Sequence, residues 1–320
     1  MVILWILTVI LLLILFSGIY VFFQACVRHK ELPWMNEEVI KKTGYARFYQ
    51  TILSSDEWLK KHKAQDVYIH SNDGLKLHAY WIPAENPIGT ILLAHGYRST
   101  YLVDFGLAFP FYHGLGMNIL VPSQRSHGLS EGRYITFGVK ESEDMRCWIE
   151  YHNENYGMHQ MVLSGLSMGA STMLYLADQV LPCNVKCIIA DCGFTSPKAI
   201  LDVVFRSVVH LYSGPTLFVA DVMAQIFAGF HLKEKDTVRV LEKAKLPVLM
   251  IHGAADDYVP CSMTQLGFEA CRGEKELLIV DGAGHGVSCL VDRLTYKNRI
   301  LSFLGKYVED FDELRSNKEL

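Results

Sequence analysis

Charged side chains are missing from the first 24 residues of this 320-residue chain. At about 1.5 Å per residue, some 20 helical residues span the hydrocarbon core of a bilayer. A cleaved signal peptide is disfavoured, because no basic segment precedes the apolar run and the run is long. A buried core helix would rarely lack polar residues on every side. We therefore expect residues 1–24 to form an uncleaved transmembrane anchor.

Basic residues are also absent before this segment and gather behind it, at Arg28, Lys30, Lys41 and Lys42. Aromatic side chains near its ends resemble those at membrane–water interfaces: Trp5, Tyr20 and Trp34. Because cytoplasmic flanks of membrane helices are enriched in Lys and Arg, the asymmetry predicts a single-pass protein of the cell membrane. The domain that follows the anchor is then expected on the cytoplasmic side.

Three further absences limit the function classes. The chain has a net charge of -4 and no basic stripe or tail, so nothing predicts nucleic acid as a partner. No internal repeat occurs, and the 24 glycines and 10 prolines are ordinary, which excludes fibrous and disordered classes. The eight cysteines form no Cys-x-x-Cys pair, so we expect free thiols in a reducing compartment rather than a zinc site.

The remainder of the chain divides into a lead-in and one large domain. Residues 25–63 are mixed, charged and aromatic, and we expect a helical lead-in that packs on the domain. From residue 64 to 310, apolar runs alternate with helical patterns. Strands are predicted at 67–70, 75–81, 90–94, 118–121, 160–163, 187–190, 248–251 and 277–280, and helices at 104–113, 137–156, 170–179, 262–271 and 290–307.

This alternation predicts an α/β fold, with a mostly parallel sheet and helices on both faces. Asn72-Asp73-Gly74 is a hairpin turn signal, so the first two strands should be antiparallel at one edge. The segment 196–245 interrupts the alternation with apolar residues in a helical pattern. We expect a helical cap insertion over the carboxyl edge of the sheet. It can serve as a lid over the substrate, or as an insertion that buries its own apolar face, and the two are compatible.

Gly165-Leu166-Ser167-Met168-Gly169 lies between a predicted strand and a predicted helix. In that setting Gly-x-Ser-x-Gly is typical of a nucleophile elbow, a strained turn that exposes a serine hydroxyl. The flanking glycines allow strand and helix to approach closely. The amide of Met168 is then available to an oxyanion at the start of a helix.

A serine nucleophile requires a base, and the base requires a carboxylate that orients it. His285 follows the last strand within Gly284-His285-Gly286 and is the predicted base. Asp256 follows the strand 248–251 and is the predicted acid, with Asp257 interpreted as a solvated carboxylate and Asp191 as the outside alternative. The order Ser, Asp, His along the chain is that of the α/β hydrolases.

A second oxyanion donor is expected after the strand 90–94, where His95-Gly96 opens a turn. The amides of Tyr97 and Met168 are the predicted pair. We interpret His95, His127 and His252 as residues that shape loops.

From about residue 64 to 308 the chain resembles the α/β-hydrolase superfamily. The resemblance rests on blocks in a characteristic order: His95-Gly96, Arg125-x-His127-Gly128-x-Ser130, Gly165–Gly169, His252-Gly253-x-x-Asp256-x-x-Val259-Pro260 and Gly284-His285. Within the superfamily it is similar to membrane-anchored bacterial hydrolases described as esterase-like or S9-peptidase-like. The chain has no room for the N-terminal propeller of the oligopeptidases, and its elbow lacks their extra glycine.

These patterns predict a serine hydrolase that cleaves carboxylic esters through an acyl-enzyme, without a metal or organic cofactor. The expected substrate is a small ester or acyl compound, with lipid-like substrates as a narrower hypothesis. Two alternatives remain open. One is a peptidase or amidase that uses the same residues, and the other is a membrane-anchored scaffold that binds without catalysis.

Overall fold

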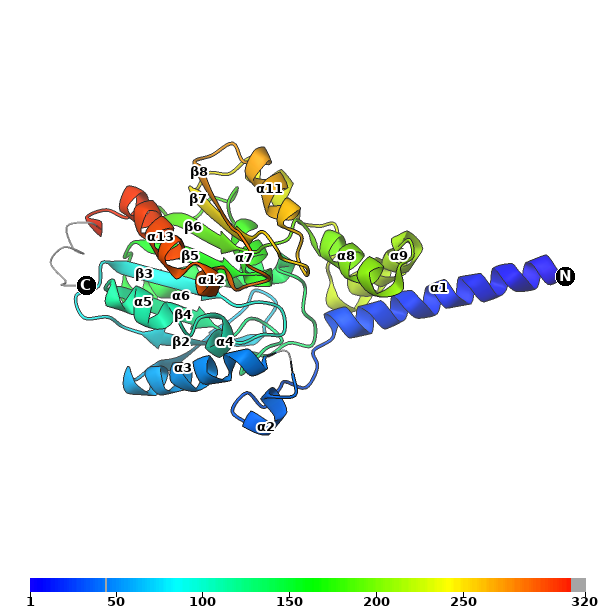
Figure 1. The fold of residues 1–320 in the computed structure, drawn as a ribbon, viewed down its shortest axis with the longest axis horizontal. Coiled ribbons are helices and arrows are strands. Elements are labelled where there is room, and N and C mark those ends of the chain that lie inside the picture. The colour runs from blue at the N-terminus through cyan, green and yellow to red at the C-terminus, as the bar shows by residue number, and fades with distance from the viewer. Residues whose placement is uncertain (44, 312–320) are drawn as a thin grey trace.

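The computed structural model describes residues 1–43 and 45–311, and it consists of an α/β body from which one long helix projects (Figure 1). That helix is α1 (Val2–Cys26), which confirms that the apolar segment is helical. Its outer part stands clear of the body, while its last turns contact the domain at Phe22 and Cys26, both buried.

Eight strands form one sheet in the order β1-β2-β4-β3-β5-β6-β7-β8. Their bounds are β1 Gln65–His70, β2 Lys76–Ile82, β3 Gly89–Ala94, β4 Met117–Pro122, β5 Met161–Leu166, β6 Val185–Asp191, β7 Val248–Gly253 and β8 Lys275–Val280. β2 pairs antiparallel with β1 and β4, and all other pairs are parallel. The mostly parallel sheet with an antiparallel hairpin at one edge is therefore confirmed.

Helices cover both faces of the sheet, because β3 to β6 are buried on both sides and present apolar residues to each. One face packs against α3 (Tyr49–Lys61), α5 (Ala108–Gly114) and α13 (Arg293–Tyr307). The other packs against α6 (Val139–Tyr156), α7 (Met168–Leu174), α10 (Thr237–Leu241) and α11 (Cys261–Ala270). The core consists of these two layers.

Three predicted helices differ in extent from those observed. The segment 104–113 is divided into α4 (Tyr101–Asp104) and α5, because Pro110 is tolerated in the first turn of a helix but not inside a longer one. The helix 170–179 ends at Leu174, where the chain tightens into turns. The last is divided into α12 (Ser288–Val291) and α13, because the Asp292 side chain caps α13 by accepting the Thr295 N–H.

Two segments lie outside the regular alternation. The lead-in forms α2 (Glu37–Ile40), a short 3₁₀ turn η1 (Ala46–Phe48) and α3. Trp34 packs edge-to-face on Tyr45, 5.0 Å between ring centroids, and is partly buried against the domain. The insertion forms α8 (Pro197–Val209), α9 (Gly214–Met223), a π-helical turn η2 (Ala224–Ala228) and α10. α9 packs along the inner half of α1, and α8 packs on α9 (Figure 1).

Candidate active site

Ser167 occupies the sharp turn between β5 and α7. Its φ of 55° and ψ of -117° lie in a region that residues other than glycine rarely adopt. The turn is possible because both flanking glycines are in tight contact with backbone. A Cβ on Gly165 would lie 2.2 Å from the Gly169 carbonyl oxygen, and one on Gly169 would lie 1.8 Å from that of Ala94. The local geometry is therefore that of the expected elbow.

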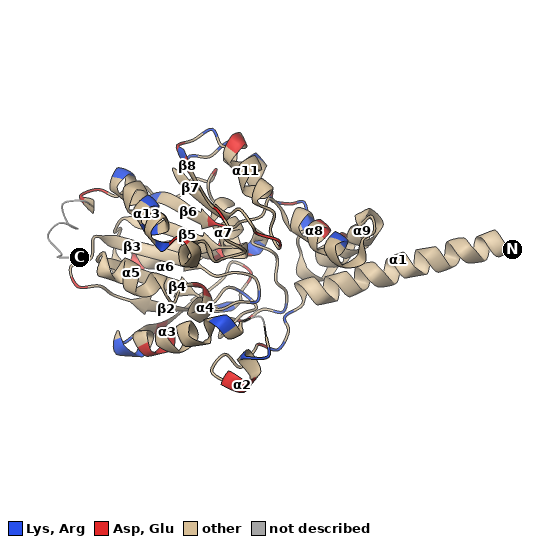
Figure 2. Ribbon diagram, viewed as in Figure 1, with Lys and Arg blue, Asp and Glu red and all other residues tan. Residues whose placement is uncertain are grey.

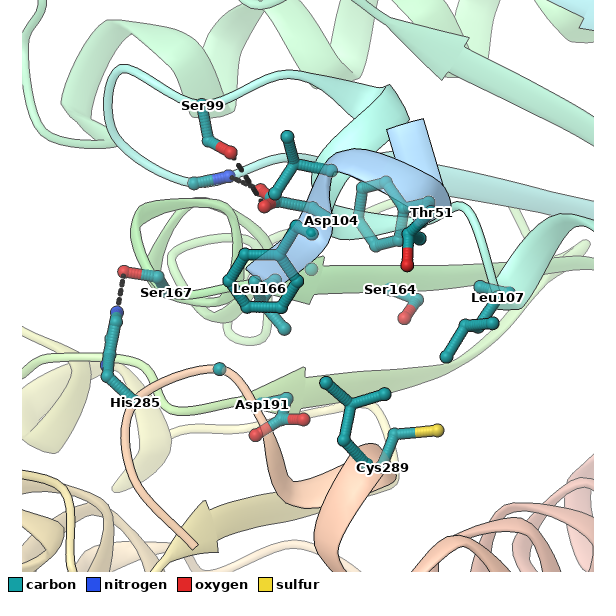
Figure 3. Close-up of a pocket in the computed structure, with 18 of the residues that line it drawn as sticks. Thr51, Ser99, Asp104, Leu107, Ser164, Leu166, Ser167, Asp191, His285 and Cys289 are labelled. Carbon is teal, nitrogen blue, oxygen red and sulfur yellow. Dashed lines mark hydrogen bonds between the residues drawn. The ribbon is translucent and has the colours of Figure 1, made fainter. Parts of the chain in front are cut away.

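The structure brings Ser167, His285 and Asp256 into one hydrogen-bonded row. The Ser167 hydroxyl lies 2.9 Å from Nε2 of His285, and Nδ1 of His285 lies 2.7 Å from Oδ2 of Asp256. Figure 3 shows the contact between Ser167 and His285. The three residues follow β5, β7 and β8, so the carboxyl ends of parallel strands gather them at one edge of the sheet.

Asp256 is the carboxylate that contacts His285. Its Oδ1 accepts the N–H groups of Tyr258 at 3.0 Å and Val259 at 2.8 Å. Burial alone would raise the pKa of this carboxyl, but hydrogen bonds from His252, His285 and Val259 hold the pKa well below its usual range. Asp256 is therefore ionised at neutral pH.

The two alternative carboxylates lie elsewhere. The Asp257 side chain is exposed to solvent. Asp191 is buried, and its Oδ2 accepts the Tyr296 hydroxyl at 3.1 Å rather than a histidine. Burial raises the pKa of Asp191 to about 6. Neither residue is hydrogen-bonded to His285.

Two backbone amides beside Ser167 have no acceptor within the described residues, namely those of Tyr97 and Met168. Met168 is the first residue of α7, where helical N–H groups have no partner within the helix. The loop that carries Tyr97 approaches Ser167 closely, since a Cβ on Gly96 would lie 3.4 Å from Ser167 Cβ. An anion beside Ser167 could accept from both amides.

Asp104 holds this loop in place, a role that the sequence analysis missed. Its Oδ2 accepts the Gly96 N–H at 2.7 Å and its Oδ1 accepts the Ser99 hydroxyl at 2.7 Å. The contact between Ser99 and Asp104 can be followed in Figure 3. Burial raises the pKa of Asp104 to about 6, against the effect of these two hydrogen bonds. No sequence signal marks the residue, because only the folded loop brings Gly96 and Ser99 to it.

His95 and His127 form hydrogen bonds that stabilise the same loop after β3. Nδ1 of His95 donates to the Gly96 carbonyl at 2.9 Å, and its Nε2 accepts the Gln124 N–H at 3.0 Å. Nε2 of His127 accepts the Arg98 N–H at 3.0 Å. Burial lowers the pKa of His95 to about 4 and that of His127 to about 3, so both are neutral at pH 7. These contacts agree with the predicted structural roles.

His252 contacts the acid loop directly. Its Nε2 donates toward the Val259 carbonyl at 2.9 Å and lies 3.1 Å from Oδ2 of Asp256. Its Nδ1 lies 2.6 Å from the Thr264 hydroxyl. His252 therefore fixes the orientation of Asp256 and of the loop around it.

A cavity of about 590 Å³ extends from Ser167 into the domain. Its walls are mainly apolar, and Leu107 and Leu166 can be followed in Figure 3. The other large apolar lining residues are Phe48, Val103, Phe105, Phe111, Leu290 and Ile300. The size and lining are those of a small-molecule site.

The cavity is covered by the lead-in, through Tyr45, Phe48 and Thr51, and no described residue of 196–245 lines it. The insertion lies near the carboxyl edge of the sheet, as expected, and packs on Met168 and Phe194. The role of this insertion as a lid over the substrate therefore stays a prediction, since none of its described residues lines this cavity. Within the insertion, α9 and η2 pack against α1.

The eight cysteines are free thiols within the described structure. One of them, Cys192, lies with Asp256 and His285 so that one ligand atom of each falls within 4.8 Å of the others. Burial raises the pKa of Cys192 well above its ordinary value, so the thiol is protonated and a poor metal ligand. Asp256 and His285 already bind one another. This group therefore does not have the character of a metal site.

No family model matches the chain. It is 30% identical over 237 residues to YqkD of Bacillus subtilis, covering 74% of this chain and 77% of that protein. It is 25% identical over 232 residues to the protein Bem46 of Schizosaccharomyces pombe, covering 71% and 72%.

Among solved structures, the esterase Pf2001 of Pyrococcus furiosus superposes with a TM-score of 0.63 at 22% identity, covering 78% of this chain and 93% of that one. The α/β hydrolase GrgF of Penicillium superposes with a TM-score of 0.60 at 19% identity, covering 77% and 99%. These likenesses and the sheet topology agree that the chain has the α/β-hydrolase fold, and its similarity to YqkD shows that it belongs to the same family as that protein.

Proposed function

We propose that this protein is a serine hydrolase that cleaves carboxylic esters through an acyl-enzyme. The observation that carries the proposal is the row of hydrogen bonds from Ser167 through His285 to Asp256. Ser167 attacks the acyl carbon while Nε2 of His285 takes its proton, and Asp256 orients the imidazole and stabilises its charge. His285 then protonates the leaving alcohol. Water, deprotonated by the same imidazole, releases the acid.

The oxyanion of the tetrahedral intermediate is proposed to bind the amides of Tyr97 and Met168. Both N–H groups lack a protein acceptor in the described structure and lie on the two segments that meet at Ser167. Such preorganised donors stabilise the charge that develops on the carbonyl oxygen. The reaction as proposed uses no metal or organic cofactor.

The apolar cavity beside Ser167 favours a substrate with an acyl chain. We expect kcat/KM for p-nitrophenyl esters to rise from acetyl to longer chains by about fourfold per buried methylene, until the cavity is filled. The measurement is a chain-length series with the full-length protein in detergent. A preference confined to the acetyl ester would contradict an acyl-chain site.

An amidase or peptidase with the same three residues is the alternative within this mechanism. Paired substrates with one acyl group, as an ester and as an aminoacyl amide, separate the two. We expect turnover of the ester only. Equal or faster turnover of the amide would support the alternative.

Asp104 is proposed as a positioning residue for the Tyr97 amide. Replacing it with alanine removes the acceptor of the Gly96 N–H, and we expect kcat to fall about 10- to 100-fold while KM changes little. Asp104→Asn is the matched control, because its side-chain oxygen can still accept from Gly96 and should restore most of kcat. Equal kcat losses in both variants, or a lower unfolding midpoint in Asp104→Ala alone, would indicate a different role.

We further propose that residues 1–24 form a single-pass membrane anchor as part of α1. The lead-in 25–63 and the hydrolase domain 64–310 follow this anchor and are proposed to lie on the cytoplasmic side of the membrane. α1 is the one described helix long and apolar enough to cross a membrane. A signal sequence passes the same test, but the contacts of α1 favour an uncleaved helix. The Tyr97 hydroxyl donates to the Ala25 carbonyl at 2.8 Å, and Arg98 donates to the carbonyls of Gln24 and Val27.

A further inference from the structure

We propose that the α8–α9 hairpin (residues 197–228, including η2) is embedded in the lipid bilayer beside α1, as a second membrane-binding element. This inference rests on the proposal that α1 spans the membrane. In this proposal the exposed apolar side chains of the insertion contact the acyl chains of phospholipids, and not the substrate.

The hairpin packs directly on α1. The hydroxyls of Ser17 and Thr216 lie 2.9 Å apart. A Cβ on Gly18 would lie 2.4 Å from Cβ of Val219, so the two helices approach as closely as small residues permit. Membrane helices use small residues and hydroxyl pairs in this way. Farther along, the rings of Phe22 and Phe227 are 5.9 Å apart.

The contacts with α1 determine how deeply the hairpin lies in the proposed bilayer. Ser17 precedes Cys26 by nine residues, which is about 14 Å along a helix. Beyond Cys26 the chain is tied to the domain, because Arg28 donates to the carbonyls of Ser130 and Gly128 at 2.7 and 2.8 Å. If the membrane surface lies near this point, Thr216 lies close to the middle of a hydrocarbon core about 30 Å thick.

α9 runs in the same direction as α1, since Thr216 meets Ser17 and Phe227 meets Phe22. The turn that precedes α9 is therefore at the deep end of the hairpin. His210 ends α8 there in the left-handed region, at φ 57°, and reverses the chain. Two large apolar side chains of this turn, Leu211 and Tyr212, are 65% and 75% exposed.

Most of the exposed side chains of the hairpin are apolar, and the exposed polar ones are Arg206, Ser207, His210 and Gln225. The exposed hydrophobic side chains are Val208, Val209, Leu211, Tyr212, Phe218, Val222, Ile226 and Phe227. Figure 2 shows α9 without Lys or Arg, adjoining the uncharged α1. An apolar face of this extent, continuous with a membrane-length helix, is unfavourable in water and suits a bilayer.

The few charges near this face have partners. Asp221 of α9 accepts the Leu232 N–H at 2.6 Å and lies 3.2 Å from His231, so it faces the domain. Arg206 and Asp202 of α8 pair with one another at 3.0 Å, with 54% of the Arg206 side chain and 23% of the Asp202 side chain exposed. No unpaired acidic or basic side chain therefore remains on α8 or α9 beyond Lys198, which lies in the first turn of α8.

The test places a small fluorescent amino acid at position 218 or, separately, at 226 of the full-length chain. Each protein is reconstituted in vesicles of phosphatidylcholine and phosphatidylglycerol, with or without phospholipid that carries a nitroxide at mid-chain. Position 180 is the control, because Val180 is also apolar and 83% exposed but lies on the loop before β6, far from α1 in sequence and fold. Unfolding midpoints equal to that of the unlabelled protein show that each labelled chain is folded.

We expect the nitroxide to quench emission from 218 and 226 by about twofold or more and emission from 180 hardly at all. If the protein floats with vesicles but 218 and 226 are not quenched, the hairpin proposal fails while the anchor stands. If the protein does not float with vesicles, both fail, although ester hydrolysis is unaffected. If both positions are shielded from lipid and from aqueous quencher while copies cross-link to one another, the face is a contact between copies, and the proposal is overturned.

Discussion

Replacing Ser167 with alanine is expected to lower kcat for ester hydrolysis about 10⁶-fold and to abolish labelling by a fluorophosphonate probe. The reason is that no other hydroxyl in the described structure is hydrogen-bonded to His285. Stability should hardly change, because alanine keeps the backbone conformation and loses one hydrogen bond. Labelling followed by gel fluorescence, together with a thermal unfolding midpoint, measures both effects.

Ser164 provides the matched control for this experiment. It lies three residues earlier, on β5, and lines the same cavity without contacting His285. Ser164→Ala should therefore label as the wild type does. If labelling survives in Ser167→Ala but disappears in Ser164→Ala, the assignment of Ser167 as the nucleophile is contradicted. Absence of labelling and turnover in the wild-type protein would favour the non-catalytic scaffold.

Asp256→Asn is expected to lower kcat about 10⁴-fold, with binding of substrate little altered. The asparagine can still accept from Val259, but it removes the negative charge beside Nδ1 of His285. An amide group there can donate to the imidazole and favour the wrong tautomer. The measurement is kcat and KM on one soluble ester.

Asp257→Asn is the neighbouring control, because this side chain is exposed. Its kcat should remain within about twofold of the wild-type value. Equal losses in the two variants would contradict the assignment of Asp256. A strong loss in Asp191→Asn with an active Asp256→Asn would instead point to the carboxylate on β6.

Much of the site could be predicted because its signals are local. Gly165 and Gly169 are required by backbone contacts that any strand–turn–helix of this kind makes, so the elbow can be recognised from five residues and their flanks. His285 and Asp256 follow apolar strands directly, and parallel strands bring their carboxyl ends to one edge. The order of the strands within the sheet depends on contacts between distant segments. The alternation of strand and helix nevertheless restricts the possible orders strongly.

What the sequence could not predict depends on contacts between distant segments. Asp104 binds Gly96 and Ser99 only because α4 and the loop after β3 fold onto one another. The cavity is covered by Tyr45 and Phe48 of the lead-in, more than 100 residues before Ser167. Periodicity indicates that a helix has an apolar face, but it does not identify what that face contacts.

The insertion at 196–245 illustrates the same limit. Its helical, apolar character follows from the sequence alone, since side-chain spacing along the chain determines which residues share a face. Its position beside α1 was decided by tertiary structure, through the fit of Val219 against Gly18 and of Thr216 against Ser17. The sequence by itself determined the fold class and the residues of the Ser–His–Asp row, because close backbone contacts and strand ends restrict residue types locally. Only packing across the folded chain decided which segments surround the cavity and which lie against α1.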